Sequence, residues 1–301
     1  MGTAIRVELW CEDGALARRA IDAVMREMWH VDETMSPYKD DSELTRINQE
    51  AASKSVTVSA EMFGLLARSL EFSRLSDGCF DVTYAAVGHL YDYRQRTRPS
   101  ERALEQARAA VGYQYLSLDP GTCSVRFGRP GMRIDLGGIA KGYAVDRGTQ
   151  ILREHGIQSA IVTAGGDSRI LGDRRGRPWN IGIADPRRPG EMIAVLPLAD
   201  VAISTSGDYE RYFEEGGERY HHLIDPRTGR SPSGVRSVTI LAPDGVCAEG
   251  LSKSVFVMGV EDGMGLVASQ VGADAVVVDA AGVLHYSNGL LQAGTGTGAP
   301  A

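Results

Sequence analysis

The sequence predicts an α+β fold with mixed, largely antiparallel sheets and packed helices. Short segments of strand-like alternation and longer segments of helical spacing are interspersed along the 301 residues, and no regular βαβ repeat persists. One strand–helix–strand unit is expected near the centre. No linker divides the chain, so we expect a single domain over residues 1–290, undivided or built from two interlocked subdomains. Residues 291–301 lack periodicity, which predicts a disordered tail.

The N-terminal half is predicted to combine short strands with amphipathic helices. Strands are expected where apolar and polar residues alternate, and helices where apolar residues recur on one face or follow a capping residue such as Ser59. The expected elements, in order, are a strand at 4–11, a helix from about Leu16 to Val31, a turn-rich and then helical segment at 35–48, a helix from Ser59 to Asp77, a helix that opens at Pro99, and short strands near Tyr115, near Val125 and at 132–135.

The central segment is the most regular part of the pattern. A strand that ends at Asp135 leads into the loop Gly-Gly-Ile-Ala-Lys-Gly, a helix to about Glu154, and a strand at 159–163 that finishes in Ala-Gly-Gly-Asp. The elements expected after it are strands at 179–183, 192–196, 201–204 and 238–241, helices from about Ala248 and from Asp262, and a strand at 275–278.

Composition excludes several classes of protein. The net charge of −7 argues against binding of nucleic acid through a basic surface. No apolar segment approaches the roughly 18 residues of a membrane span. The N-terminus lacks the basic segment and apolar core of a signal peptide, which favours a cytoplasmic protein, although removal of a leader would leave the same sequence. The four cysteines lie far apart, so neither a zinc site nor a disulfide framework is indicated.

Two glycine-rich loops favour a ligand site at the centre of the chain. The loop 135–142 joins a predicted strand to a helix, where backbone N–H groups and the helix N-terminus favour an anion, and Lys141 adds a positive charge. For this loop alone, a tight turn with a solvated lysine is the simpler interpretation. The loop 164–167 follows the next strand and ends in a carboxylate, so the two loops together favour a ligand site. Rossmann, Walker A, α/β-hydrolase and HExxH motifs are absent from the sequence.

The basic residues are strongly biased toward arginine. The chain has 28 arginines and four lysines, a bias typical of genome composition, so each lysine that is retained raises the question of a chemical role. The four are Lys39, Lys54, Lys141 and Lys253.

Two further polar clusters follow strands or turns. Residues 204–209 combine hydroxyls, a glycine and the carboxylate of Asp208 at a strand end, and residues 220–229 place His221 and His222 before an Asp-Pro turn. A turn of this kind and a histidine pair carry little information alone, because both are common on protein surfaces.

Taken together, these motifs resemble the ApbE family, the FAD:protein FMN transferases, from Met1 to about residue 280. Each motif alone is weak, but seven occur in the family's order with similar spacing. They are MGT at 1–3, MSPY at 35–38 with SEL at 42–44 and Asn48, GCFDVT at 78–83, DLGGIAKGYAVD at 135–146, AGGD at 164–167, STSGDYER at 204–211 and HHLIDPRTG at 221–229. The resemblance implies an ApbE-like architecture related to the T-fold.

The resemblance also implies a site for FAD. Its residues come from motifs spread over most of the chain. They are Met1 and Tyr38 against the flavin or adenine rings, Cys79, Phe80 and Asp81 through backbone and carboxylate groups, Asp135 and Lys141 at the dinucleotide, Asp208 in the STSGDYER motif, and His222 with Ile224 in a further contact segment.

The magnesium motif of the family is altered in this chain. The resemblance implies a Mg²⁺ ion near the diphosphate, bound by the carbonyl of Gly138 and by an aspartate and a threonine at a helix start. Here Glu249 replaces the aspartate and Lys253, next to Ser252, replaces the threonine. Glutamate can bind Mg²⁺, but a protonated amine has no lone pair. Since Glu249 and Lys253 are spaced i, i+4, either they neutralise each other and no metal binds, or the ammonium replaces part of the metal's charge.

The activity that the resemblance implies is transfer of FMN from FAD to a Thr or Ser hydroxyl of a partner protein, with release of AMP. Lys141 and the metal, or its replacement, would stabilise the diphosphate, and Glu249 or His222 would be the base for the acceptor hydroxyl. Two alternatives remain open: an FAD-binding protein with a degenerate metal site, which Lys253 favours, and an FAD pyrophosphatase that gives FMN and AMP. The expected partners are FAD and an acceptor protein.

Overall fold

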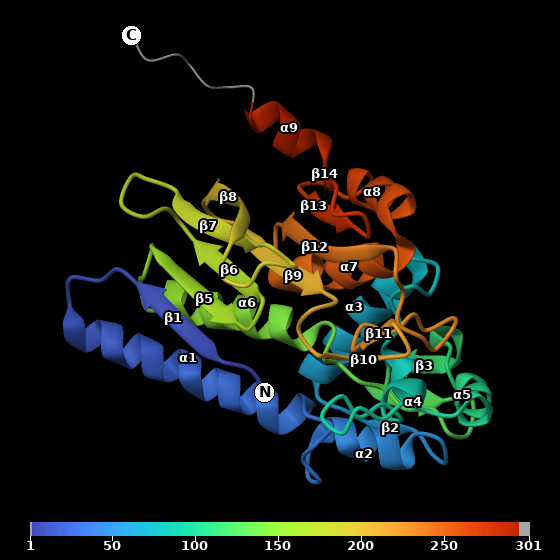
Figure 1. The fold of residues 1–301 in the computed structure, drawn as a ribbon. Coiled ribbons are helices and arrows are strands. Elements are labelled where there is room, and N and C mark those ends of the chain that lie inside the picture. Colours follow the sequence, from blue (N-terminus) through green and yellow to red (C-terminus); the bar gives the residue numbers. More distant parts are fainter. Residues whose placement is uncertain (1, 295–301) are drawn as a thin grey trace.

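The computed structural model describes residues 2–294, and its largest element is a seven-stranded sheet (Figure 1). The strands, in spatial order, are β1 (Ile5–Leu9), β5 (Ala160–Ala164), β6 (Asp167–Leu171), β9 (Ala202–Gly207), β12 (Val235–Ala242), β13 (Asp274–Asp279) and β14 (Leu284–Tyr286). Every strand pairing within this described range is antiparallel. The predicted α+β fold with antiparallel sheets and packed helices is confirmed.

Helices cover one face of this sheet. The helices are α1 (Gly14–Met35), α6 (Ala140–Glu154), α7 (Gly245–Met258) and α8 (Val260–Ala268). Helix α6 packs on β5 and β6, α7 packs on β9 and β12, and α1 lies along α6 (Figure 1). Helix α1 begins where Asp13 accepts the N–H groups of Ala15 and Leu16, and its buried face follows helical spacing.

The first turns of α6 and α7 come unusually close together. A Cβ atom on Gly142 of α6 would lie 2.1 Å from the carbonyl oxygen of Gly245 in α7, so this crossing requires glycine. Asp146, one turn further along α6, accepts the N–H groups of Gly245 and Val246 at 2.7–3.1 Å. The N-terminal turns of both helices are therefore held at one place beside the sheet.

A hairpin covers the other face of the sheet. It consists of β7 (Trp179–Ala184) and β8 (Met192–Leu198) and packs its apolar side chains on Ile170, Ile203 and Leu241. The neighbours of two of these residues, Leu171 and Ile240, belong to the main core with the helices. Because successive strand residues point to opposite faces, the sheet is buried on both sides.

A smaller group of elements surrounds a three-stranded sheet of order β2-β4-β3. Its members are α2 (Glu43–Glu50), β2 (Val56–Thr57), α3 (Ala60–Leu75), the short helices at 82–84 and 113–115, α4 (Ala85–Gly88), α5 (Glu101–Arg108), β3 (Leu116–Asp119) and β4 (Ser124–Phe127). One cluster of buried apolar residues runs from this group into the main sheet, so both parts share a core.

The predicted strand at 132–135 is wrong. Its backbone is bound by a side chain instead of a neighbouring strand: Asn48 Nδ2 donates to Ile134 O at 3.0 Å, and Ile134 N–H donates to Asn48 Oδ1 at 2.8 Å. The N–H of Asp135 donates to Val82 O at 3.0 Å. Residues 132–135 therefore join no sheet, although a strand was predicted there.

Several elements were not expected from the sequence, among them β2, β14, α4 and the short helices at 82–84 and 113–115. The larger unexpected elements are β6, the hairpin of β10 (Tyr212–Glu215) and β11 (Glu218–His221), and α9 (Asn288–Gly294). Helix α9 includes residues 291–294, for which disorder was predicted, and residues 295–301 lie outside the described range, as does Met1. Within residues 2–294 we find no helix with both the length and the apolar composition of a membrane span.

Candidate active site

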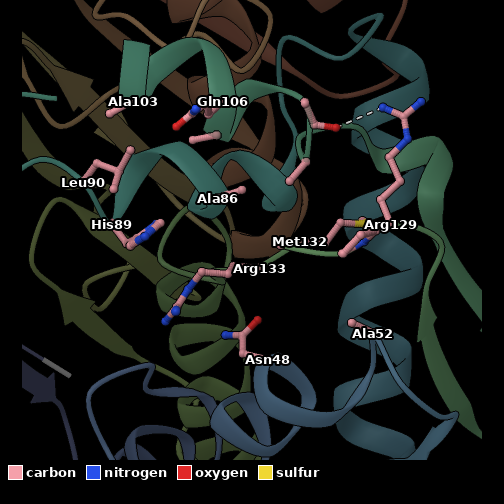
Figure 2. A pocket seen from close by; sticks show the side chains of 15 residues that line it. Asn48, Ala52, Ala86, His89, Leu90, Ala103, Gln106, Arg129, Met132 and Arg133 are labelled. Carbon is pink, nitrogen blue, oxygen red and sulfur yellow. Dashed lines mark hydrogen bonds between the residues drawn. The ribbon is translucent and has the colours of Figure 1, made fainter. Parts of the chain in front are cut away.

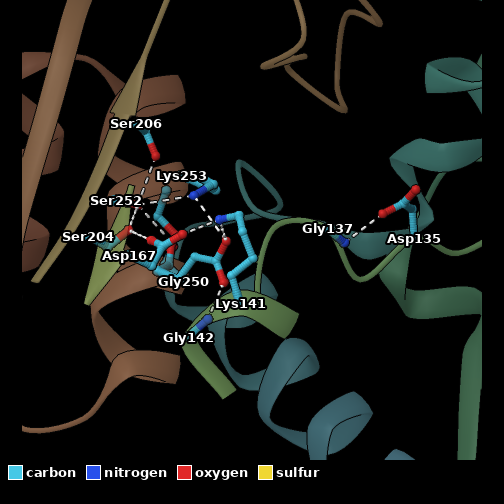
Figure 3. Close-up of polar contacts among 12 residues, drawn as sticks. Asp135, Gly137, Lys141, Gly142, Asp167, Ser204, Ser206, Gly250, Ser252 and Lys253 are labelled. Atoms are coloured by element: carbon cyan, nitrogen blue, oxygen red, sulfur yellow. Dashed lines mark hydrogen bonds and ion pairs between the residues drawn. The ribbon is translucent and has the colours of Figure 1, made fainter. Parts of the chain in front are cut away.

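Four charged side chains meet where α6, α7 and β6 converge (Figure 3). Lys141 is in the first turn of α6, Asp167 is the first residue of β6, and Glu249 and Lys253 are one turn apart on α7. The close approach of the two helices brings together charged residues that are far apart in the sequence; Lys141 and Lys253 are separated by 112 positions. We call these four residues the lysine–carboxylate cluster.

Within the lysine–carboxylate cluster, both ammonium groups contact the same carboxylate oxygen. Lys141 Nζ donates to Glu249 Oε1 and to Asp167 Oδ2, and Lys253 Nζ lies 3.4 Å from Glu249 Oε1. The N–H of Gly142 donates to Glu249 Oε2 at 2.7 Å, and the hydroxyl of Ser204 donates to Asp167 Oδ1. Every carboxylate oxygen of the cluster thus accepts from a donor, and its two positive and two negative charges cancel.

Burial and ion pairing act in opposite directions on these groups. Burial alone would raise the pKa of Asp167, but the ammonium groups of Lys141 and Lys253 hold it below its ordinary value. Burial alone would lower the pKa of Lys141, but Asp167 and Glu249 raise it. For Lys253, burial lowers the pKa and the ammonium of Lys141 lowers it further, against the opposing effect of the carboxylates. Lys253 is therefore the cation of the cluster that is least compensated.

Three buried serine hydroxyls complete the hydrogen bonding around the cluster. Ser252 Oγ lies 3.0 Å from Ser204 Oγ and 2.8 Å from Ser206 Oγ, and it donates to the carbonyl oxygen of Glu249 at 2.9 Å. These contacts tie β9 to α7 (Figure 3). The hydroxyl of Ser252 is buried, and its hydrogen-bonding capacity is already used within this network.

The residues of this site do not fit the magnesium ion that the resemblance implies. Mg²⁺ requires near-octahedral oxygen ligands at about 2.0–2.1 Å. Among residues 2–294 there is no group of three or more His, Cys, Asp or Glu side chains that could hold a metal. The oxygens of Glu249 already accept from Lys141, Lys253 and Gly142. A dication about 4 Å from an ammonium would be repelled by roughly 8 kcal/mol at an effective dielectric of 20.

The glycine loop before α6 lies against the cluster at one point. A Cβ atom on Gly138 would be 3.6 Å from Lys253 Cγ and 3.4 Å from the ring of Phe80. Asp135 lies on the far side of this loop from the cluster (Figure 3), where its Oδ1 accepts the N–H of Gly137 at 2.6 Å. Burial raises the pKa of Asp135. The structure therefore brings together Phe80, Gly138 and Lys253 and places Asp135 apart from the cluster.

His222 offers an unused nitrogen near the cluster. Its backbone N–H donates to Arg211 O at 3.0 Å, but its Nδ1 is buried and has no hydrogen-bond partner. Burial lowers the pKa of His222 to about 3, and the charge of Lys253 acts in the same direction. The imidazole is therefore neutral at ordinary pH. The neighbouring His221 also has a buried Nδ1 without a partner, but its ring packs edge-on against Phe256 and its Nε2 bonds Pro232 O.

The segment that contains Cys79 and Asp81 is tied to the smaller part of the fold. Asp81 accepts the N–H and hydroxyl of Thr83 through Oδ1 and the N–H of Tyr113 through Oδ2, so both of its oxygens already stabilise this loop. Burial raises the pKa of the Cys79 thiol to about 11, which keeps it protonated. Tyr38, in contrast, is 88% exposed and makes an aromatic face available to a ligand.

Asp208 and Ile224 are both buried. Asp208 accepts two N–H groups from Arg187 at 2.5–2.6 Å, and Arg219 approaches it to 3.5 Å. Its carboxylate thus fixes the end of β9 to the connection between β7 and β8. Asp208 therefore has a structural role, and its direct contact with FAD stays a prediction.

A separate cavity of about 880 Å³ lies between α2, α4, α5 and residues 129–133 (Figure 2). Its lining includes Asn48, His89 and Arg133, and Arg129 donates to Ala109 O at its edge. No residue predicted for FAD or metal binding lines it. The cavity and the lysine–carboxylate cluster are therefore separate sites that share no residue.

Sequence reasoning did not assign a role to several residues of the site. Asp167 was noted as the carboxylate that ends a glycine loop, but its pairing with Lys141 depends on the contact between β6 and α6. Ser204 was noted only as part of a hydroxyl-rich strand end. The exposed Arg211 adds a positive charge that acts on both Asp135 and His222. The signal for Arg211 was its place in the STSGDYER motif.

Comparison with known proteins gives consistent matches. The model of the ApbE family matches residues 1–277. The FAD:protein FMN transferase of Vibrio cholerae is 33% identical over 96% of this chain and 88% of its own length, and that of Treponema pallidum is 33% identical over 92% and 82%. The crystal structure of the ApbE protein from Thermotoga maritima, 35% identical, superposes with a TM-score of 0.90 over 97% of this chain and 96% of that chain. The flavin transferase ApbE from Vibrio cholerae superposes with a TM-score of 0.86 at 31% identity, over 97% and 96%. The family model spans most of the sequence, and the solved ApbE structures superpose on nearly the whole chain. The chain therefore belongs to the ApbE family.

Proposed function

We propose that this protein transfers FMN from FAD to a Thr or Ser hydroxyl of an acceptor protein and releases AMP. The family supports the reaction, because its curated relatives are FAD:protein FMN transferases. The single observation of the structure that carries the proposal is the pair of ammonium groups of Lys141 and Lys253 beside the glycine loop. Such a pair is suited to the two negative charges of a diphosphate.

The reaction is a displacement at phosphorus. The hydroxyl oxygen of the acceptor attacks the FMN phosphorus of FAD and forms a new P–O bond, while the bond from this phosphorus to the bridging oxygen breaks. The hydroxyl proton goes to a base on the enzyme, and AMP leaves with the bridging oxygen. In phosphoryl transfer, positioning and charge neutralisation supply most of the rate enhancement. Lys141 would neutralise the negative charge that develops on the bridging oxygen.

Of the two predicted bases, His222 is supported better than Glu249. Glu249 is fully buried, and its oxygens accept from Lys141, Lys253 and Gly142, so it has no free oxygen for an acceptor hydroxyl. His222 is neutral and keeps Nδ1 without a partner. Burial is the main cause of the low pKa of His222 and the charge of Lys253 is the next, so a diphosphate bound at the lysines would remove part of the shift and make His222 a stronger base.

Tyr38 and the loop at 78–81 are proposed to hold the aromatic rings of FAD. Tyr38 is exposed and can stack on a flavin or adenine ring. Phe80 lies next to Gly138, so the loop at 78–81 adjoins the proposed diphosphate site. The carboxylate of Asp81 keeps this loop in place through Thr83 and Tyr113, and the backbone N–H groups of Gly78, Cys79 and Phe80 are bonded within the loop and the end of α3.

Product analysis tests the proposal. The purified protein is incubated with FAD, alone and with synthetic peptides that carry Thr or Ser, and AMP, FMN and flavin-labelled peptide are separated by chromatography. We expect AMP and labelled peptide in equal amounts, and AMP only when an acceptor is present. AMP and FMN without any acceptor would indicate a pyrophosphatase. Bound FAD with no product from any acceptor would indicate a binding protein. Either result contradicts the transferase.

A further inference from the structure

Two of the four lysines of the chain meet at one carboxylate. Lys141 and Lys253 both contact Glu249 Oε1, although the chain otherwise uses 28 arginines for its basic residues. A lysine carries its charge at a compact ammonium on a flexible stem, whereas arginine carries it over a broad planar fork. Two compact cations can therefore approach one buried oxygen, an arrangement that two guanidinium groups would crowd.

The position of Lys253 relates it to the ligand site. Its Cγ lies beside Gly138, which itself adjoins Phe80 of the loop at 78–81. The side chain of Lys253 is 14% exposed, whereas that of Glu249 is fully buried. Rotation of the aliphatic stem can thus bring the ammonium group to a ligand next to the glycine loop. The ion pairs of Lys141 with Asp167 and Glu249 would remain in place.

The oxygens of the cluster leave no place for a dication, whereas its two ammonium groups are the groups that a dianion would contact. Lys141 balances Asp167 and Glu249 from within, and Lys253 brings the sum to zero. A metal that entered would need oxygens that already accept from ammonium and N–H groups. A diphosphate that entered would meet the least compensated ammonium, that of Lys253.

We propose that Lys253 takes the place of a divalent cation in this protein, so that FAD binds through the Lys141–Lys253 pair without magnesium. This inference rests on the proposed function, because it concerns the diphosphate of the same FAD site. It differs from the magnesium dependence that the family resemblance implies. It also differs from a purely structural Glu249–Lys253 pair, which would leave FAD affinity unchanged when the lysine is replaced.

FAD titrations followed by flavin fluorescence test the inference. The wild type is titrated in excess EDTA and in millimolar Mg²⁺, and so are Lys253→Thr, the double variant Glu249→Asp with Lys253→Thr, and Lys54→Thr. The last is a matched control, because Lys54 forms an i, i+4 pair with Glu50 on the surface. Circular dichroism and thermal unfolding of each variant show whether it folds.

For the wild type and Lys54→Thr, we expect the Kd of FAD to differ less than about twofold between EDTA and Mg²⁺. In EDTA, Lys253→Thr is expected to bind FAD about 10-fold or more weakly, the scale of a lost hydrogen bond between charged groups. The double variant is expected to regain affinity at least about 10-fold on addition of Mg²⁺, because its carboxylate and hydroxyl can then act as ligands.

Three outcomes would overturn the inference. The first is a wild type whose FAD binding weakens 10-fold in EDTA. The second is a folded Lys253→Thr variant whose Kd equals that of the wild type. The third is a folded double variant that ignores Mg²⁺. If the wild type binds no FAD under either condition, the proposed function itself fails. FAD binding that occurs only with Mg²⁺ would refute this inference and leave the proposed function standing.

Discussion

Two glutamate–lysine pairs in this molecule share the same i, i+4 spacing but differ in their surroundings. Glu249 and Lys253 of α7 lie 3.4 Å apart with side chains 0% and 14% exposed, whereas Glu50 and Lys54 at the end of α2 lie 3.0 Å apart with side chains 36% and 64% exposed. The surface pair has the shorter contact. Water screens it, so it contributes on the order of 0.3–0.5 kcal/mol.

The buried pair belongs to a network of ion pairs and hydrogen bonds, whereas the surface pair lies at the C-terminal end of α2. Glu249 also binds Lys141 and the N–H of Gly142, so its removal would leave two ammonium groups without their shared partner. Removing one partner of a buried ion pair commonly costs about 3–5 kcal/mol. Burial, and not spacing in the sequence, therefore determines how much each of these ion pairs contributes to stability.

The largest effect is expected for Glu249→Gln. This change keeps an acceptor for Gly142 but removes the charge that holds Lys141 and Lys253, so it should lower the free energy of unfolding by about 3–5 kcal/mol. Urea denaturation measures it. The matched surface change, Glu50→Gln, is expected to stay within about 0.5 kcal/mol of the wild type. A loss below about 1 kcal/mol for Glu249→Gln would show that the buried network is not cooperative.

The second prediction concerns pH and His222. Its pKa is lowered to about 3 in the folded protein, chiefly by burial, and an unfolded histidine has a pKa near 6.5. The unfolded state therefore takes up a proton that the folded state refuses, and stability falls as the pH drops from about 6.5 toward 3. We expect His222 to account for roughly 2–4 kcal/mol of this loss, at about 1.4 kcal/mol per pKa unit.

The measurement for His222 is the free energy of unfolding at several pH values. His222→Gln should flatten the curve between pH 6.5 and 4. Equal slopes in the wild type and His222→Gln would mean that His222 is not held neutral by the fold.

The third prediction is a loss of ligand affinity in Lys141→Ala. Because Lys141 is proposed to contact the diphosphate, the change should weaken FAD binding by about 1–3 kcal/mol, the scale of a charge-assisted hydrogen bond. Fluorescence titration measures the Kd, with Lys54→Ala as the surface control. An unchanged Kd in folded Lys141→Ala would reduce Lys141 to a structural partner of Asp167 and Glu249.

The fourth and smallest effect is a pH dependence expected from one of two aspartates that accept N–H groups at the start of a helix. Asp13 accepts N–H groups at the start of α1 and is exposed, and these bonds lower its pKa. Asp146 accepts N–H groups at the start of α7, but burial raises its pKa to about 6. The folded state thus holds a proton on Asp146 that the unfolded state has released, so its contribution to stability decreases as the pH rises from about 4 to 6.

Asp146→Asn should remove this dependence, which we expect to be roughly 1–2 kcal/mol across that range. Unfolding measured at pH 4 and at pH 7 tests it. If the difference between these two values is the same in the wild type and the variant, Asp146 does not titrate as its burial implies.

The sequence predicted the fold well where local signals agree with packing. Ser59 and the helical spacing of apolar residues predicted the helix at 60–75, and alternation predicted β1. It failed at 132–135, because the side chain of Asn48 takes the hydrogen bonds that a strand would make. Asn48 is 86 positions away from Ile134, so no local sequence pattern could predict this contact.

The site was predicted in part for a similar reason. Motif residues such as Lys141 and Glu249 were found, because the family pattern marks them in the sequence. Their shared contact depends on the close approach of Gly142 and Gly245, which only the folded chain shows. Lys253 was identified as a departure from the family, but its contact with the same oxygen as Lys141 required the structure.

Calorimetric titration of Mg²⁺ into the FAD-saturated protein distinguishes between ammonium groups and a metal ion as the positive charges at the diphosphate. We expect no saturable heat for the wild type and one tight site per chain for the double variant Glu249→Asp with Lys253→Thr. One tight magnesium site in the wild type would contradict this expectation.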